Sequence, residues 1–507
     1  MRATAAGARF VGCAGVLLTA VIALAACGSR MQGASSVPAA RGPDALLGVW
    51  VPDAAPRRLL TADGAAPPLN AKAVALYAER QQQIAAGTAN FDPTTWCAGP
   101  GMPRIMTMPY PFEIRRAGNY VAFLYGWYRW FRTVDMTARE IAVPFPTTLG
   151  FPAGYWDGDT LVIRTVGLAD STVMDASGLP RSDQSVLTER LRILPDGRLE
   201  DRITVEDPGS FTQPWDTILT FHRDGRARVT DDVCLDRLGA GEPAEMLSAA
   251  PTQQGAQPAH AVPSTSSASA PPKPAAVPAL TGLWEPKIFG ILVPDTPLTK
   301  VGRDIVDRSA AALKSNLIPH SAWTSCRPGA ISTMTMPREK IVILESPEEV
   351  TILFEMPRMV RRIRLNAEHT ANLAPSYVGD SIGRWEGSTL VVDTIGYNGY
   401  AELDARGQPT SPRLRTVERF TPTADGDINI VTTVTDPEYY DKSFDIPRSW
   451  QRADAGLPLE YDCAENPRQE DFENGYYIRE RYRPVCMRVE GEGMEPSKMV
   501  CGSPKTR

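Results

Sequence analysis

The chain has 507 residues, with 53 Lys and Arg against 59 Asp and Glu, giving a formal net charge of -6. This balance excludes a broad basic surface, so we expect no nucleic-acid partner. With four histidines, no Cys-x-x-Cys, no HExxH and no Gly-rich phosphate loop, the sequence predicts no metal site and no cofactor.

The N-terminus predicts export. Arg2 and Arg9 precede an apolar stretch over 11–23 that is too short to span a membrane and soon reaches Cys27. The ending Leu-Ala-Ala-Cys resembles the lipobox of bacterial lipoproteins, which implies a signal peptide over 1–26 and a lipid anchor on Cys27. Gly28 is not the aspartate that retains many such proteins at the inner membrane. In a Gram-negative cell the resemblance therefore implies the outer membrane, facing the periplasm, with an ordinary secreted protein as the alternative.

Composition divides the rest of the chain into two domains. Residues 27–42 are a tether of small residues, and 242–278, rich in Ala, Pro and Ser, predict a disordered linker. This leaves one β domain at 43–241, a second at 279–470 and a charged tail at 471–507.

The second domain repeats the first at an offset of 229 residues. Trp156–Ile163 returns as Trp385–Val392, and Glu189 returns as Glu418 at the same offset. Positions kept in both copies are expected to serve the fold, and positions that diverge show where the copies differ in function.

Each copy predicts one early helix followed by mainly antiparallel strands. The helices are expected at Ala71–Ala85 and Lys300–Leu313. Asp-Gly pairs predict tight turns at Gly158 and Gly197, and residues 340–354 alternate as a hairpin. About eight strands per copy favour a meander that closes into a barrel, because closure removes exposed edges; an open sandwich is the alternative.

A Gly-x-Trp tripeptide opens both copies, at Gly48–Trp50 and Gly282–Trp284. It resembles the start of the first strand in lipocalin-like barrels, where the tryptophan plugs the closed end. The expected fold is therefore all-β, with two tandem lipocalin-like β-barrels that each carry a short helix.

Cysteine spacing predicts disulfides. After Cys13 leaves with the signal and Cys27 carries lipid, an even number of six remains, as expected in an oxidising compartment. Two pairs share a separation of 137 residues, and the remaining pair falls in the tail. The expected disulfides are Cys97–Cys234, Cys326–Cys463 and Cys486–Cys501.

The second copy resembles a family of exported bacterial proteins of unassigned function. The motifs that carry the resemblance are Gly282–Trp284, Cys326, Met334–Pro337, Arg361–Ile363, Gly379–Thr394 and Tyr461–Asn466. The first copy keeps Met106–Pro109 and Trp156–Leu161 but loses Gly-x-Ser-x-Gly and the closing Glu-Asn. This resemblance implies that the chain is related to that family, but it implies no catalysed reaction.

Three catalytic candidates, Ser381, His369 and Glu368, lie in the second copy. Ser381 sits in Gly-x-Ser-x-Gly, the hydrolase nucleophile pattern, but a strand and a turn follow it, and copy one has no serine there. We favour small residues that let backbones cross closely. His369, next to Glu368, is a candidate general base or anion ligand, with a solvated loop histidine as the favoured alternative.

Arginines spaced three apart recur in both copies and are candidate ligand-binding residues. Such pairs can meet a carboxylate or phosphate of a ligand. We favour instead buried ion pairs with Glu189 and Glu418. The arginines are Arg129, Arg132, Arg358 and Arg361.

An aromatic run in copy one exceeds what one core face requires. It predicts a lined cavity, a docking surface between the domains, or additional core packing. Tyr125 and Trp127 are its candidate ligand-binding residues. The run comprises Tyr120, Phe123, Tyr125, Trp127, Tyr128, Trp130 and Phe131.

The leading hypothesis is a lipid-anchored envelope protein that binds a small apolar or amphipathic ligand in its barrels, with Arg358 and Arg361 or their copy-one equivalents at the polar head. One alternative is a hydrolase or isomerase that uses His369 with Glu368 or Ser381. The other is a non-catalytic scaffold that contacts an envelope protein partner through its aromatic face.

Overall fold

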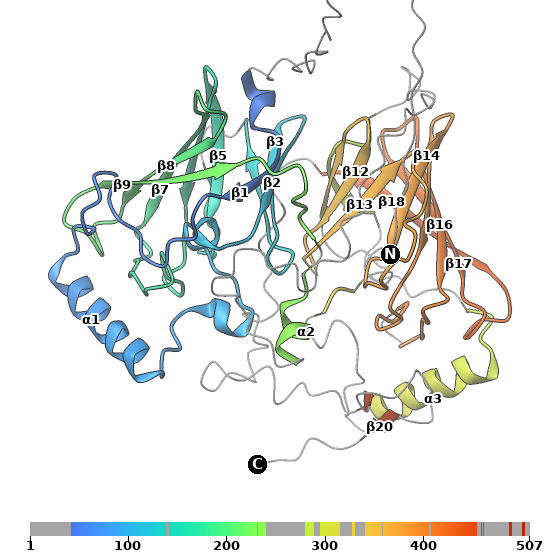
Figure 1. Ribbon diagram of the computed structural model, residues 1–507. Helices are drawn as coiled ribbons and strands as arrows, with labels where there is room; N and C mark the ends of the chain where they lie inside the picture. The colour runs from blue at the N-terminus through green and yellow to red at the C-terminus, as the bar shows by residue number, and fades with distance from the viewer. Residues whose placement is uncertain are drawn as a thin grey trace, which may run out of the picture. The chain divides into compact units, whose positions relative to one another are not determined.

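Both copies fold into closed barrels, which confirms the expected fold class (Figure 1). The computed structural model describes residues 42–137, 141–230, 232–239, 279–287, 295–314, 327–329, 340–356, 358–404, 407–453, 458, 460, 486–488 and 499–501. Each barrel has nine strands, against the roughly eight expected. The strands of barrel 1 fall within 43–241 and those of barrel 2 within 279–470.

The strands follow one another around each barrel in sequence order. Barrel 1 consists of β1 (Gly48–Pro52), β2 (Phe112–Ala117), β3 (Tyr120–Tyr125), β4 (Phe131–Asp135), β5 (Phe151–Asp157), β6 (Thr160–Val166), β7 (Val186–Ile193), β8 (Leu199–Glu206) and β9 (Trp215–His222). Barrel 2 consists of β10 (Gly282–Pro286), β11 (Ile341–Glu345), β12 (Glu349–Phe354), β13 (Met359–Leu365), β14 (Asp380–Glu386), β15 (Thr389–Ile395), β16 (Arg415–Pro422), β17 (Ile428–Thr435) and β18 (Phe444–Arg452).

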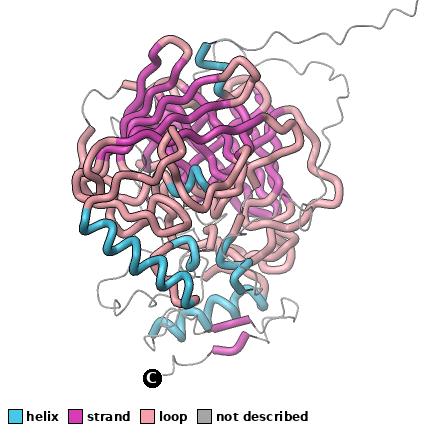
Figure 2. Tube along the Cα trace, turned by 60° about the vertical axis from the view of Figure 1, so that its left-hand side comes forward, coloured by secondary structure: helices cyan, strands magenta, loops and turns pink. Residues whose placement is uncertain are grey.

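Helices are few and lie beyond the strand ends. In Figures 1 and 2 the two longest, α1 and α3, extend away from the strands. Both match the expected helices, and α1 begins where the Asn70 side chain accepts from Ala73 N at 3.0 Å and ends at left-handed Gly87. The helices are η1 (Gly42–Leu46), α1 (Ala71–Ala86), η2 (Pro93–Trp96), η3 (Arg104–Thr107), α2 (Cys234–Gly239) and α3 (Lys300–Lys314). None in the described part of the chain is both long and apolar enough to span a membrane.

Neighbouring strands are antiparallel except at one junction in each barrel, which the sequence did not predict. β4 and β5 pair in parallel through Asp135 and Ala153, and β13 and β14 pair in parallel from Ile363 with Ser381 to Leu365 with Gly383. The connection between the two strands is long in both copies, so the chain returns to the same end before the next strand starts. The junction of barrel 1 has the shorter pairing, because β4 and β5 share a single residue pair.

The Gly-x-Trp motif has the same surroundings in both barrels. Trp50 is fully buried, donates from Nε1 to Leu46 O at 2.8 Å, and lies 4.1 Å below the Arg223 guanidinium. A Cβ on Gly48 would come within 2.8 Å of that guanidinium, so the close stacking requires glycine. The same arrangement recurs in barrel 2 with Gly282, Trp284, Leu280 and Arg452.

The aromatic run contributes to the core of barrel 1 and to a contact between the barrels, two of the roles that the sequence left open. Phe123, Tyr125, Trp127, Tyr128 and Trp130 belong to the core of barrel 1. Phe131, with Tyr120 against it, belongs to a separate apolar cluster that joins outer wall residues of the two barrels. That cluster contains Ala122, Leu124, Phe131, Leu283, Val342, Leu344 and Leu353.

Polar contacts surround this cluster, and both barrels belong to one compact unit. Arg358 lies 4.3 Å above the Trp130 ring and donates to Phe131 O at 2.6 Å. Arg362 pairs with Glu113 at 2.6 Å. Arg358, a predicted ligand residue, is thus placed where it joins the two copies.

One expected disulfide is confirmed, between Cys97 and Cys234. Cys27, Cys326 and Cys463 lie outside the described residues, as do the expected signal peptide and linker. The backbones of β19 (Cys486–Arg488) and β20 (Met499–Cys501) pair with Cys486 opposite Cys501. Their side chains are not described, so this third disulfide stays a prediction.

Candidate functional site

Each barrel interior contains one arginine–glutamate pair, as the ion-pair alternative expects. Arg132 on β4 donates to Glu189 on β7 at 2.7 and 2.9 Å, and Arg361 on β13 donates to Glu418 on β16. Burial alone would lower the pKa of Arg132 and of Arg361, but the facing carboxylate outweighs it and raises both. The charges are therefore held inside the barrels as pairs.

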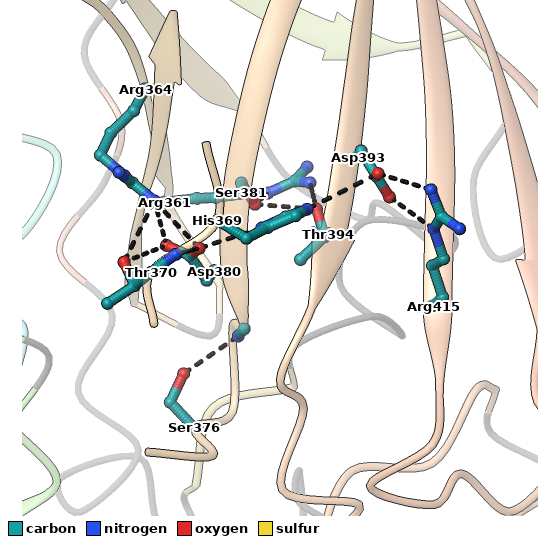
Figure 3. Close-up of polar contacts among 11 residues, drawn as sticks. Arg361, Arg364, His369, Thr370, Ser376, Asp380, Ser381, Asp393, Thr394 and Arg415 are labelled. Atoms are coloured by element: carbon teal, nitrogen blue, oxygen red, sulfur yellow. Dashed lines mark hydrogen bonds and ion pairs between the residues drawn. The ribbon is translucent and has the colours of Figure 1, made fainter. Parts of the chain in front are cut away.

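Barrel 2 surrounds its pair with hydrogen-bonding side chains, two of which, Ser381 and Thr394, are drawn beside Arg361 in Figure 3. Arg361 donates from Nε to Ser381 Oγ at 3.2 Å and from Nη2 to Thr394 Oγ1 at 3.1 Å. Tyr397 shares a hydrogen bond of 2.9 Å with Thr416, and burial raises the pKa of Tyr397 to about 12. Each of these groups therefore has a protein partner.

Barrel 1 lacks part of this network. Pro152 stands where barrel 2 has Ser381, so no described residue accepts a hydrogen bond from Arg132 Nε. Thr165, which matches Thr394, has a buried hydroxyl that also lacks a partner among the described side chains and backbone groups. The same ion pair therefore sits in an incompletely satisfied setting.

Barrel 1 also contains a second carboxylate that barrel 2 does not have. Asp201 on β8 is 0 % exposed and occupies the place of Ile430 in barrel 2. Neither of its oxygens has a hydrogen-bond partner in the described chain, and the same is true of the Tyr125 hydroxyl. Both groups lie close enough to Arg132 and Glu189 to interact electrostatically. We call Tyr125, Arg132, Thr165, Glu189 and Asp201 the polar cluster of barrel 1.

Ionisation of Asp201 gives the polar cluster an excess of negative charge, and the buried site opposes that ionisation. Burial, followed by the neighbouring Glu189 carboxylate, raises the pKa of Asp201 well above its usual range, and Arg132 only partly counteracts this. Burial likewise raises the pKa of the Tyr125 hydroxyl. One arginine cannot neutralise two carboxylates, so ionised Asp201 requires another cation or hydrogen-bond donors.

We expect Asp201→Asn to stabilise the ligand-free protein at neutral pH. Because the pKa is raised by folding, Asp201 costs no stability below its unfolded pKa and increasingly destabilises the fold as pH rises above it. The gain should therefore shrink toward zero near pH 4. Chemical denaturation of wild type and variant from pH 4 to 8 measures it, and a gain that does not change with pH would contradict the argument.

His369 lies between two ion pairs of barrel 2 (Figure 3). Its Nδ1 is 3.0 Å from Asp380, which also binds Arg364 at 2.8 Å, and its Nε2 is 3.6 Å from Asp393. Burial alone would raise the pKa of Asp380, but hydrogen bonds from Thr370 N, His369 and Arg364 lower it. The imidazole thus links carboxylates that other groups already neutralise.

The catalytic candidates are not brought together. Asp380 and Ser381 are consecutive on β14, so their side chains point to opposite faces of the wall. His369 contacts Asp380, whereas Ser381 is buried against Arg361, and Glu368 is exposed. The strand runs through a turn into β15, so the nucleophile elbow is not formed. A Cβ on Gly383 would come within 2.8 Å of Ile363, the close crossing that we favoured.

The remaining predicted ligand residues have different surroundings. Trp127 is 1 % exposed and packs edge-on against Tyr128, with ring centroids 5.9 Å apart. Arg129 lies in the loop after β3 and is described further below. Sequence reasoning missed Asp201, although strand alternation with inward Leu199 and Ile203 places it on the inner face.

No protein-family model matches the chain, and no curated protein is significantly similar to it. The resemblance to an exported bacterial family therefore stays a prediction.

Proposed function

We propose that the protein binds a small amphipathic molecule inside barrel 1, with the polar end of the ligand at the polar cluster. The observation that carries this proposal is the fully buried Asp201 carboxylate, which has no hydrogen-bond partner among the described residues. Buried polar groups without partners are rare and often mark functional sites. Barrel 2 supplies the internal comparison, because the matching residue there is Ile430 and Arg361 Nε donates to Ser381.

The cluster defines the chemistry of the ligand's polar end. Ionised Asp201 accepts hydrogen bonds and attracts a positive charge, while the hydroxyls of Tyr125 and Thr165 donate or accept. An amine fits best, because it both donates hydrogen bonds and offsets the excess negative charge. The core residues of the same barrel are apolar and suit a hydrocarbon or aromatic remainder; they include Phe112, Phe123, Leu191, Leu219 and Phe221.

This proposal changes the role given to the arginines. Arg361 is fully engaged by Glu418, Ser381 and Thr394, so barrel 2 is assigned no ligand. In barrel 1, Arg132 is paired with Glu189, so only its Nε is left to donate a hydrogen bond to a ligand. The ligand's polar end therefore meets a carboxylate rather than a guanidinium.

The proposed location is the bacterial cell envelope, with the protein anchored by lipid on Cys27 and facing the periplasm. The export signal over 1–26 and the lipobox-like ending support this location. The Cys97–Cys234 disulfide supports an oxidising compartment.

Native mass spectrometry tests the proposal. The full chain, gently purified from cells that express it naturally, should carry an extra mass that denaturation removes. Asp201→Asn should lower the fraction of loaded protein at least about tenfold, corresponding to about 1.4 kcal/mol or more of binding free energy. Glu206→Gln is the matched control, since it removes an exposed carboxylate from the same strand and should leave loading unchanged.

Two results would count against the proposal. Wild-type protein that shows only its own mass would indicate an interior filled by water and side chains, and would favour the scaffold alternative. An extra mass that Asp201→Asn retains in full would place the ligand elsewhere.

A further inference from the structure

The loop between β3 and β4 holds two consecutive residues in a conformation that side-chain-bearing residues rarely adopt. Tyr128 has φ 44° and Arg129 has φ 58°. Left-handed backbone at non-glycine residues persists where surrounding contacts fix it, and it clusters at binding sites. Here Tyr128 N donates to the Asp232 carboxylate at 2.8 Å, and Trp130 N donates to Trp127 O at 3.2 Å.

This loop places a buried guanidinium that has no anionic partner within the described ranges of the chain. Arg129 is 6 % exposed, and its carbon Cζ lies 4.9 Å from the centre of the Tyr128 ring. Its Nε and Nη1 are buried, and no described group accepts a hydrogen bond from either. A buried positive charge is costly unless it is paired, so this arrangement favours an anion.

The acidic residues of the adjoining segment already have cationic partners. Asp232 pairs with Arg237 at 2.7 Å, and Asp236 pairs with Arg327 at 2.6 Å. The Tyr377 hydroxyl also donates to Asp236 at 3.0 Å. Burial and the Asp236 carboxylate raise the pKa of Tyr377, whereas the positive charges of Arg327 and Arg129 act to lower it. Both arginines therefore lie close enough to Tyr377 to interact with it electrostatically. With these carboxylates engaged, Arg129 is the excess cation.

We propose that Arg129 is the centre of a binding site for an oxyanion, either a carboxylate or a phosphate group. The guanidinium fork matches the oxygens of both groups, and the Tyr128 ring holds its plane in position. The site is independent of the ligand proposed inside barrel 1, because that ligand meets the Asp201 carboxylate and prefers a cation. It requires no residue of the polar cluster.

Isothermal titration calorimetry tests the site on the full chain, with inorganic phosphate or acetate as probes in a low-salt Tris chloride buffer. Wild type should bind one ion per chain with saturation below about 10 mM, and Arg129→Gln should weaken binding at least about tenfold. Arg190→Gln removes an exposed positive charge from β7 and should bind as wild type does. Arg129→Lys keeps the charge but loses the fork, and should bind with intermediate affinity.

The arms of the experiment identify the anion. Tighter binding of acetate than of phosphate assigns a carboxylate, and the reverse assigns a phosphate. Dihexanoyl phosphatidate that binds more tightly than inorganic phosphate assigns a lipid head group, whereas equal affinity assigns the free ion.

Two results would overturn the site. One is the absence of saturable binding by wild type, a result that does not depend on any variant being folded. The other is an equal loss of affinity in Arg190→Gln and Arg129→Gln. Asp201→Asn separates the two proposals, because it should abolish loading of barrel 1 and leave anion binding intact.

Discussion

Glu418→Ala should lower the free energy of unfolding of barrel 2 by about 3–5 kcal/mol, because it leaves the buried Arg361 guanidinium without its counter-ion. Urea denaturation followed by tryptophan fluorescence measures the loss, since Trp284 and Trp450 lie in the same core. Removing both charges with Arg361→Met and Glu418→Leu together should recover most of it, because no uncompensated charge remains. A double variant as unstable as Glu418→Ala would show that the charge pair is not the cause.

The matched substitution in barrel 1 provides the control. Glu189→Ala should cost less than Glu418→Ala, because Asp201 lies near Arg132 and can replace the lost negative charge. Barrel 2 has Ile430 at that position and no such replacement. Equal losses in the two barrels would mean that Asp201 is not close enough to act as a counter-ion.

Replacing Cys97 and Cys234 by alanine should destabilise barrel 1 by up to about 5 kcal/mol at 25 °C. The reason is the length of the closed loop, since the cysteines are separated by 137 residues and the crosslink restricts the unfolded chain. Comparing the denaturation midpoints of the variant and the oxidised wild type measures the loss. The expected figure is an upper limit, because residual structure in the unfolded chain reduces it.

Reduction of the wild type is the companion measurement. Both cysteines are fully buried, so mild reductant should act on the disulfide only after barrel 1 opens. Rapid reduction under native conditions, or a variant destabilised by less than about 1 kcal/mol, would contradict this account.

Local sequence signals predicted most of the fold. Asp-Gly pairs marked the turns at Gly158 and Gly197, and both glycines have positive φ, 60° and 85°, whereas the preceding aspartates do not. The hairpin at 340–354 and the two helices follow from the spacing of their apolar residues in the same way. The parallel junction was not predictable, because strand direction after a long connection depends on where the chain returns.

The candidate site was harder to predict, because its character depends on what surrounds each side chain. Alternation places Asp201 inward, but only the folded barrel shows that no described donor reaches it. Barrel 1 has Pro152 where barrel 2 has Ser381, and this difference leaves Arg132 Nε without the acceptor that Arg361 Nε has. It could be recognised only from the structure, which shows that Ser381 binds Arg361. Arg129 Nε and Nη1 have no acceptor among the described residues, where the neighbouring carboxylates bind other cations, a consequence of tertiary placement alone.

The parallel junction of barrel 1 has a kinetic consequence. A molecule inside the barrel can exchange with solvent past an end of the barrel or through the wall where backbone hydrogen bonds open, and such openings occur where the fewest must break. β4 and β5 share a single residue pair, whereas β7 and β8 share eight, so the wall should part first between β4 and β5. Ligand exchange by this route would then follow the rate of local opening between β4 and β5 rather than the rate of diffusion.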